Sequence, residues 1–204
     1  MKSKSLLFIV LIFVFLSGCM VYSFYPLYTE DDLFPNDLLV GEWTNSDSAV
    51  WKFDFNYNGK RLPENRDSTS FILKIKDKDQ SDFDQASFLI HLIKLDGTYF
   101  LDFYLEDYLE DDNLTIFDLH VLPVHSFAKL ELDGDQAKLS WFSPDWLEEL
   151  IKQNRIRIHH ENNGEYILLT AKPRELQKFV IKYVNSEEAF KDGIDEELHR
   201  VKND

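Results

Sequence analysis

The chain has 204 residues, enough for one domain with a hydrophobic core, and its 44% apolar and 15% aromatic residues exclude a disordered chain. Its net charge of −15 argues against nucleic acid as a partner, because binding phosphates needs a basic surface. Its single cysteine excludes a disulfide framework and a zinc site built on cysteines.

Residues 1–18 have the pattern of a secretory signal peptide. Two lysines precede eleven uninterrupted apolar residues, too few to cross a bilayer as a helix, since about 20 are needed. The tetrad Leu16-Ser17-Gly18-Cys19 resembles the lipobox of bacterial lipoproteins. This resemblance implies cleavage between Gly18 and Cys19. It also implies a diacylglyceryl group on the Cys19 sulfur and acylation of the new amino terminus, for example with palmitate.

The lipobox resemblance also implies a location. Two or three acyl chains anchor a protein to a membrane effectively permanently, so we expect the membrane to be a partner through the N-terminal lipid. Many Gram-negative lipoproteins that stay in the inner membrane have an aspartate after the cysteine, whereas this chain has Met20. We therefore expect a cell-envelope protein, in the outer membrane if there is one. An uncleaved signal anchor and ordinary secretion are the alternatives.

The remaining chain divides into three parts by composition. Residues 19–37 are aromatic at first and acidic afterwards, with two prolines, which predicts a short tether between the lipid and the domain. The domain itself is expected over residues 38–185. Residues 186–204 are strongly charged, which predicts a weakly held C-terminal tail.

Within the domain, short segments with alternating apolar and polar residues predict half-buried antiparallel strands. These segments are 49–55, 71–76, 87–95, 99–105, 127–132 and 137–142, with a further hairpin over 155–160 and 165–170. Asp96-Gly97 and Asp133-Gly134 each separate two of these segments, and Asp-Gly is a strong hairpin signal. About eight or nine strands at regular spacing predict a mainly β fold, a closed barrel or a sandwich.

Two peripheral helices are predicted, over residues 144–154 and near 173–184. Ser143-Pro144-Asp145 offers an N-cap, a proline at the first helical position and an acid in the first turn. In the second helix, apolar residues recur every three or four positions from Leu176 to Val184, which indicates one buried face.

The motif Gly41-Glu42-Trp43 opens the run of strands and resembles the G-x-W start of lipocalin-type barrels. In that family the glycine permits a tight approach to the strand and the tryptophan plugs the barrel floor, where a basic residue stacks on it. The resemblance implies an antiparallel lipocalin- or calycin-like barrel with Gly41 and Trp43 at its floor. Arg155 and Arg157 are the candidates for the stacking residue.

A second resemblance covers most of the chain after the signal peptide. The sequence is similar to a group of uncharacterised bacterial lipoproteins, which supports location and fold and implies no activity. The segments that carry this similarity are Tyr25-Pro26-Leu27-Tyr28, Gly41-Glu42-Trp43, residues 120–125, Pro144-Asp145-Trp146-Leu147 and Leu169-Thr170-Ala171.

The titratable residues do not converge on a metal or catalytic site. His120 and His125 face apart on an extended chain unless it turns at Pro123, and the adjacent pair His159-His160 also faces apart. His91 lies in an apolar run, which predicts a core or interior-lining position. The acidic cluster over 106–112 lacks the glycine of a calcium loop, and no hydrolase elbow, P-loop or zinc-protease motif occurs. We therefore predict no metal, no cofactor and no enzyme.

Three functions remain open. The prediction is a non-enzymatic interaction or structural module whose barrel is filled by its own side chains. The alternative is a carrier of a small apolar ligand or lipid, since an eight-stranded barrel is just wide enough to be filled or to hold one ligand. A membrane-attached enzyme is the third. The expected partner is an apolar small molecule or another envelope protein.

Overall fold

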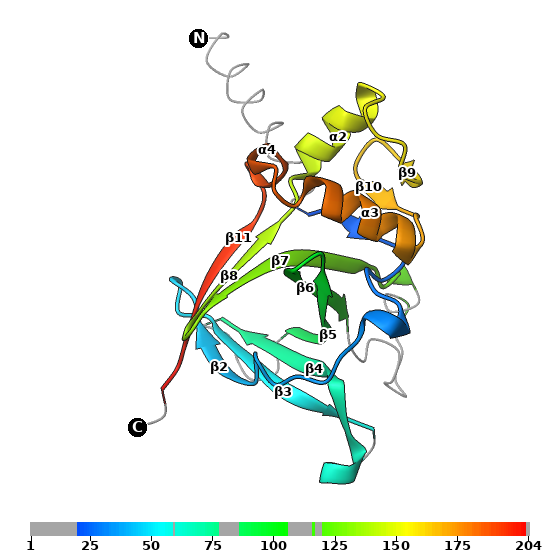
Figure 1. Cartoon of the computed structure of the whole chain (residues 1–204). Coiled ribbons are helices and arrows are strands. Elements are labelled where there is room, and N and C mark those ends of the chain that lie inside the picture. The colour runs from blue at the N-terminus through cyan, green and yellow to red at the C-terminus, as the bar shows by residue number, and fades with distance from the viewer. Residues whose placement is uncertain (1–19, 59, 78–85, 106–115, 117–119, 203–204) are drawn as a thin grey trace.

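A computed structural model describes residues 20–58, 60–77, 86–105, 116 and 120–202 (Figure 1). Eight antiparallel strands form a closed barrel, as the sequence predicted. In order around the ring they are β2 (Gly41–Thr44), β3 (Val50–Tyr57), β4 (Arg66–Lys76), β5 (Ala86–Leu95), β6 (Thr98–Leu105), β7 (His125–Asp133), β8 (Gln136–Trp141) and β11 (Asp195–Arg200).

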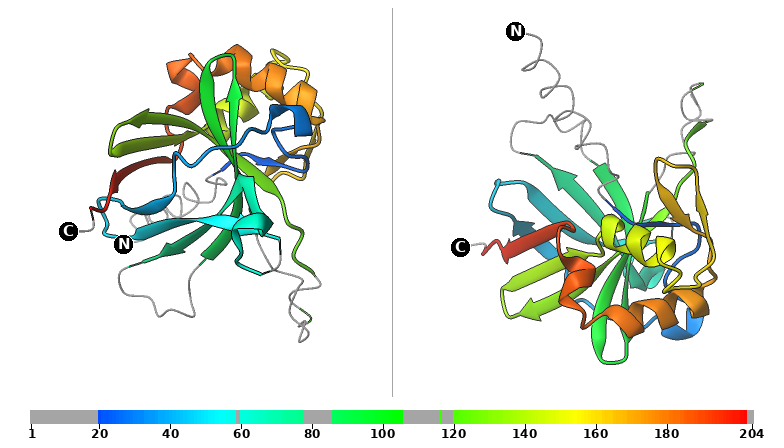
Figure 2. Two further views of the ribbon diagram at one scale, coloured as in Figure 1. Left: turned by 60° about the horizontal axis from the view of Figure 1, so that its bottom comes forward. Right: turned by 90° about the horizontal axis from the view of Figure 1, so that it is seen from above.

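The other elements lie outside the ring. Three short strands extend the sheet from β7: β1 (Tyr22–Ser23), β10 (Ile167–Leu169) and β9 (His160–Asn162). Two single 3-10 turns, η2 (Glu30–Asp32) and η3 (Pro63–Asn65), interrupt the connections. The helices α2 (Pro144–Lys152), α3 (Pro173–Tyr183) and α4 (Glu187–Phe190) gather on one side of the barrel, as Figure 2 shows.

The strand register places one set of apolar side chains inside the barrel. Residues opposite each other on neighbouring strands share a face of the sheet, and the pairs Trp43–Trp51, Phe53–Leu73 and Phe103–Ser126 all belong to the inner face. The most completely buried large side chains of this inner set are Trp43, Phe53, Phe71, Leu73, Ile90, Leu92, Leu101 and Leu139.

A second apolar cluster lies on the outer face of the barrel, under the helices. Phe100 on β6 and Phe127 on β7 point outward and are buried there. On the helix side the cluster includes Leu147 of α2 and Phe179 of α3. The two predicted helices are therefore peripheral, as expected, and the apolar face of each is directed at the barrel. The structure adds α4 as a third helix.

The C-terminal segment differs from the prediction of a loosely held tail. Residues 195–200 form β11, which pairs with β8 on one side and β2 on the other and so closes the barrel. The segment looked like a charged tail because, of its six side chains, only Leu198 is apolar and buried. Backbone pairing on both edges, rather than apolar content, holds this strand in place.

The predicted tether is also part of the fold from residue 20 to residue 37. Val21 and Leu27 are buried in the outer cluster, and β1 pairs with both β7 and β10. Leu33 forms a further bridge to Ile93 on β5. The mixture of aromatic and acidic residues hid this docking, since Val21 and Leu27 are buried against the barrel whereas η2 is made of three acidic residues.

Candidate functional site

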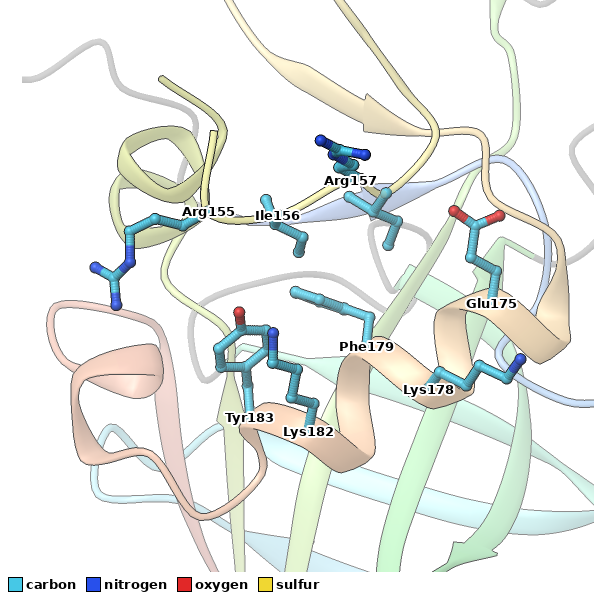
Figure 3. A pocket seen from close by; sticks show the side chains of 9 residues that line it. Arg155, Ile156, Arg157, Glu175, Lys178, Phe179, Lys182 and Tyr183 are labelled. Carbon is cyan, nitrogen blue, oxygen red and sulfur yellow. The ribbon is translucent and has the colours of Figure 1, made fainter. Parts of the chain in front are cut away.

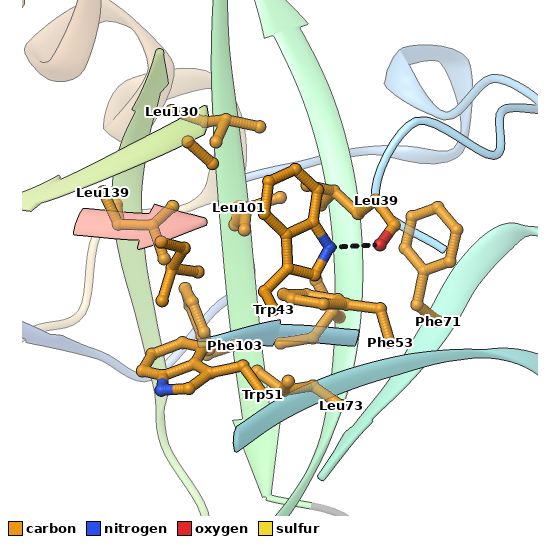
Figure 4. Packing of buried hydrophobic residues seen from close by; sticks show 14 of the residues in the cluster. Leu39, Trp43, Trp51, Phe53, Phe71, Leu73, Leu101, Phe103, Leu130 and Leu139 are labelled. Carbon is orange, nitrogen blue, oxygen red and sulfur yellow. Dashed lines mark hydrogen bonds between the residues drawn. The ribbon is translucent and has the colours of Figure 1, made fainter. Parts of the chain in front are cut away.

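One end of the barrel is closed by stacking of Arg200 on Trp43. The guanidinium carbon of Arg200 lies 4.1 Å from the centroid of the Trp43 ring, and Trp43 Nε1 donates a hydrogen bond of 2.8 Å to the carbonyl oxygen of Leu39 (Figure 4). Arg200 Nη1 and Nη2 donate to the carbonyl oxygens of Val40 and Leu38, at 2.7 and 2.8 Å. The stacking residue is thus Arg200, at the end of β11.

Arg155 and Arg157, the sequence-based candidates for this stacking, do not reach Trp43. They line a separate pocket of about 220 Å³ between residues 155–158 and α3, together with Lys178 and Lys182 (Figure 3). The sequence could not identify Arg200, because its assignment depends on recognising β11, in which Arg200 is the cross-strand partner of Trp43.

The glycine of the G-x-W motif has a structural reason here. Gly41 adopts φ +127°, and a Cβ atom at this position would lie 3.0 Å from Nη1 of Arg200. Both the backbone angle and the close approach of the guanidinium favour the absence of a side chain. Gly41, Trp43 and Arg200 therefore form one unit at the closed end.

The opposite end of the barrel contains a cavity of about 460 Å³. Its walls are inward-facing side chains near the starts of β3, β5, β7 and β11 and the ends of β4, β6 and β8, together with the N-terminal segment and the residues before β7. This volume is within the range of about 300–1,000 Å³ that is typical of small-molecule sites. The lining residues are Met20, Tyr22, Trp51, Ile75, Phe88, Phe103, Leu105, Val121, Leu122, Pro123, Val124, Ser126, Trp141, Ile194 and Glu196.

The cavity is mainly apolar and carries few polar groups. Glu196 is the only Asp, Glu, Lys, Arg or His among the lining residues that the structure describes. Its Oε2 accepts a hydrogen bond of 3.1 Å from Nδ2 of Asn45, and Asn45 Oδ1 in turn accepts from the backbone N–H groups of Asp47 and Ala49. The Asn45 amide is thereby fixed, and it orients the Glu196 carboxylate.

Two tryptophans of the cavity wall have buried indole N–H groups without an acceptor among the described residues, namely Trp51 and Trp141. Figure 4 shows the indole nitrogen of Trp51 on the side of the ring away from Trp43. Buried donors in proteins are nearly always paired, with protein or with ordered water. Hydrogen bonding of the indole groups is therefore less complete in the cavity wall than at the closed end, where Trp43 Nε1 has an acceptor.

A buried polar cluster lies on the outer face of the barrel, beneath the N-terminal segment. Asp102 on β6 is fully buried, and its two carboxylate oxygens bind His125 Nδ1 at 2.7 Å and the backbone N–H of Leu27 at 2.8 Å. This arrangement ties the N-terminal segment to the barrel wall. Among the described residues, no serine or cysteine within hydrogen-bonding distance of the His125 ring completes a nucleophilic triad.

His91 lies beside this cluster on β5, buried on the outer face rather than lining the interior. Its ring is 4.3 Å from that of Tyr28, and its Nδ1 has no hydrogen-bond partner among the described residues. Burial lowers the pKa of the His91 imidazole, against the opposing influence of the Asp102 and Asp67 carboxylates. Burial, together with Asp102, raises the pKa of the Tyr28 phenol. Burial thus favours the neutral form of the His91 imidazole.

Three further histidines, His120, His159 and His160, each have a separate partner. His120 Nδ1 is 2.6 Å from the carbonyl oxygen of Ile116, His159 pairs with Glu175, and His160 Nδ1 is 2.8 Å from the carbonyl oxygen of Ile158. Over the part of the chain that the structure describes, no group of three or more acidic, histidine or cysteine residues is arranged to hold a metal ion. Gly18, Cys19 and the acidic cluster over 106–112 lie outside the described residues.

Comparisons with protein-family models, with curated proteins and with solved structures give no match to this chain. In the described parts of the chain, no helix has the length and apolar content needed to cross a membrane.

Proposed function

We propose that this protein is a membrane-anchored, non-enzymatic lipocalin-like binding protein that holds one small apolar molecule in the cavity at the end of the barrel opposite Trp43 and Arg200. The cavity of about 460 Å³ carries this proposal. The sequence left open whether the barrel interior is filled or hollow. Large side chains fill the floor around Trp43, whereas the opposite end retains an apolar space, which favours the ligand-binding alternative over a barrel filled only by its own side chains.

The proposed lipid on Cys19 supports a role at the membrane surface. Met20, which lines the cavity, directly follows Cys19 in the chain. An apolar molecule taken from the membrane is therefore a suitable class of ligand for the proposed site. We expect Cys19→Ala to leave an unprocessed precursor or to release the domain from the membrane, and unchanged processing and membrane binding would contradict the lipid anchor.

The binding proposal can be tested by filling the cavity. Ser126 is a small inward-facing residue of the cavity wall, and Ser126→Trp would occupy part of the space. The control is Glu131→Trp, which places the same side chain at an exposed position on the same strand. Native mass spectrometry of the intact chain in a neutral detergent should show a non-covalent apolar adduct on the wild type and on the control, and little on Ser126→Trp.

Either of two results would contradict ligand binding in the cavity. One is the absence of any non-covalent adduct on the wild type, even after addition of a neutral single-chain alcohol. The other is the same adduct on all three proteins, which would place the bound molecule elsewhere.

A further inference from the structure

The chemistry of the cavity wall restricts which amphiphile it can take. Glu196 lies on the inner face of β11, as the cross-strand partner of the inward-facing Leu139. It forms no ion pair with a described residue, so no cation in the described structure neutralises it. Any ligand in the cavity therefore meets a carboxylate.

The carboxylate is also preorganised. Asn45 holds Oε2, while no described residue donates to Oε1, which leaves this oxygen as an acceptor for a ligand. Because Asn45 is itself fixed by two backbone N–H groups of the β2–β3 turn, binding a ligand would not require Glu196 to be ordered first. An acceptor in this state suits a hydroxyl or ammonium group.

The position of Glu196 also orients the ligand. In the ring of eight strands β5 is opposite β11, and its contribution to the cavity is Phe88. The apolar wall continues over Leu105 of β6, the cross-strand partner of Phe88, and over Ile75 of β4, which pairs with Ala86 on β5. A molecule that fills the cavity would have its polar end at β11 and its apolar part against β4, β5 and β6.

On this basis we propose that the cavity selects single-chain amphiphiles whose polar end is a hydrogen-bond donor without negative charge, such as an ammonium or a hydroxyl group, and discriminates against carboxylates. This inference rests on the proposed binding function and specifies its ligand class. A fatty acid would place a second carboxylate against Glu196, and two carboxylates in one partly desolvated site disfavour ionisation of both. An ammonium group would instead form a charge-assisted hydrogen bond.

The test uses three probes with the same twelve-carbon chain: dodecylamine, 1-dodecanol and dodecanoic acid. Each is added at pH 7.5 to the intact chain in a neutral detergent, and bound probe is measured by native mass spectrometry. Three proteins are compared: the wild type, Glu196→Gln and Glu197→Gln. Glu197 is the matched control, because it is the next residue of β11 and is exposed. The detergent takes up each probe equally in all three samples, so differences between the proteins report the cavity.

We expect the wild type and Glu197→Gln to bind dodecylamine at least tenfold more than dodecanoic acid, with 1-dodecanol in between. Glu196→Gln should reduce this ratio by at least tenfold, because the amide keeps the shape and the contact with Asn45 but removes the charge. Ser126→Trp, measured alongside these three proteins, should bind less of each probe, because the tryptophan occupies part of the cavity.

The outcomes separate the two proposals. If none of the three probes binds in the cavity, the proposed function fails. If the probes bind but the amine-to-acid ratio is the same in the wild type and Glu196→Gln, or the wild type prefers the acid, the cavity binds ligands and the selectivity proposed for Glu196 is wrong.

Discussion

Removal of the Arg200 side chain should weaken the closed end of the barrel by an amount that can be worked out from its contacts. The stacking of its guanidinium on Trp43 contributes about 1 kcal/mol in a partly buried setting. The two hydrogen bonds to the carbonyl oxygens of Leu38 and Val40 each contribute about 1.5 kcal/mol, since the donor is charged. Ordering a long side chain offsets these gains by up to about 2 kcal/mol. We therefore expect Arg200→Ala to lower the free energy of unfolding by about 2–4 kcal/mol.

The assay is urea unfolding of the intact chain, followed by tryptophan fluorescence. The midpoint should fall while the dependence on urea stays constant, because the surface exposed on unfolding is nearly the same. Arg200→Lys should recover only part of the loss, since an ammonium group cannot span two carbonyls and stack as a plane. Arg61→Ala is the control. Arg61 pairs with the carboxylate of Asp54, but its side chain is 68% exposed, so its loss should cost less than about 0.5 kcal/mol.

The reasoning about the closed end would be refuted by an Arg200→Ala protein as stable as Arg61→Ala. It would also be refuted if Arg200→Lys were as stable as the wild type, because charge alone would then account for the effect.

Three further predictions concern the buried residues. Trp43→Ala should lower the free energy of unfolding by about 3–5 kcal/mol, measured in the same urea assay, and an unchanged midpoint would remove Trp43 from the core. Asp102→Asn should cost about 2 kcal/mol and speed hydrogen exchange at the Leu27 amide, because a neutral amide cannot accept from both Leu27 and His125; unaltered exchange at Leu27 would contradict this anchoring role. His91→Gln should flatten the fall in stability between pH 7 and pH 5. The unfolded chain binds a proton at His91 more readily than the folded chain, so the contribution of His91 is present above about pH 6.5 and is lost as the pH falls towards its lowered pKa. An identical pH profile for wild type and variant would show that His91 is not the group responsible.

The barrel strands were predictable from sequence where one face of the strand is apolar. The alternation around Trp51 and Phe53 identified β3, and Asp96-Gly97 identified the β5–β6 hairpin, in which both residues adopt positive φ. These signals are local, since a period of two and a turn dipeptide each reflect neighbouring residues only. The α2 helix was recognisable for the same reason, from its N-cap Ser143 and the following proline.

The missed features depend on pairing between distant parts of the chain. In β11 only Leu198 carries the apolar signal, so nothing local distinguishes this strand from a charged tail. Without β11, the sequence could identify neither Arg200 as the partner of Trp43 nor Glu196 as a wall of the cavity. His91 was predicted to be buried but not on which face, because β5 has apolar residues on both sides where the N-terminal segment covers its outer face.

The central claim, that the cavity of the barrel holds an apolar molecule, is tested most directly in intact cells. The photo-reactive residue benzoylphenylalanine would replace Phe88 on the inner wall of the cavity or, in the control, the exposed Glu131. After irradiation of intact cells, mass spectrometry of the purified chain should find a cross-linked small apolar molecule at position 88 and none at position 131. Cross-links at position 88 only to other residues of the chain, no product at all at position 88, or the same small-molecule adduct at both positions would contradict the claim.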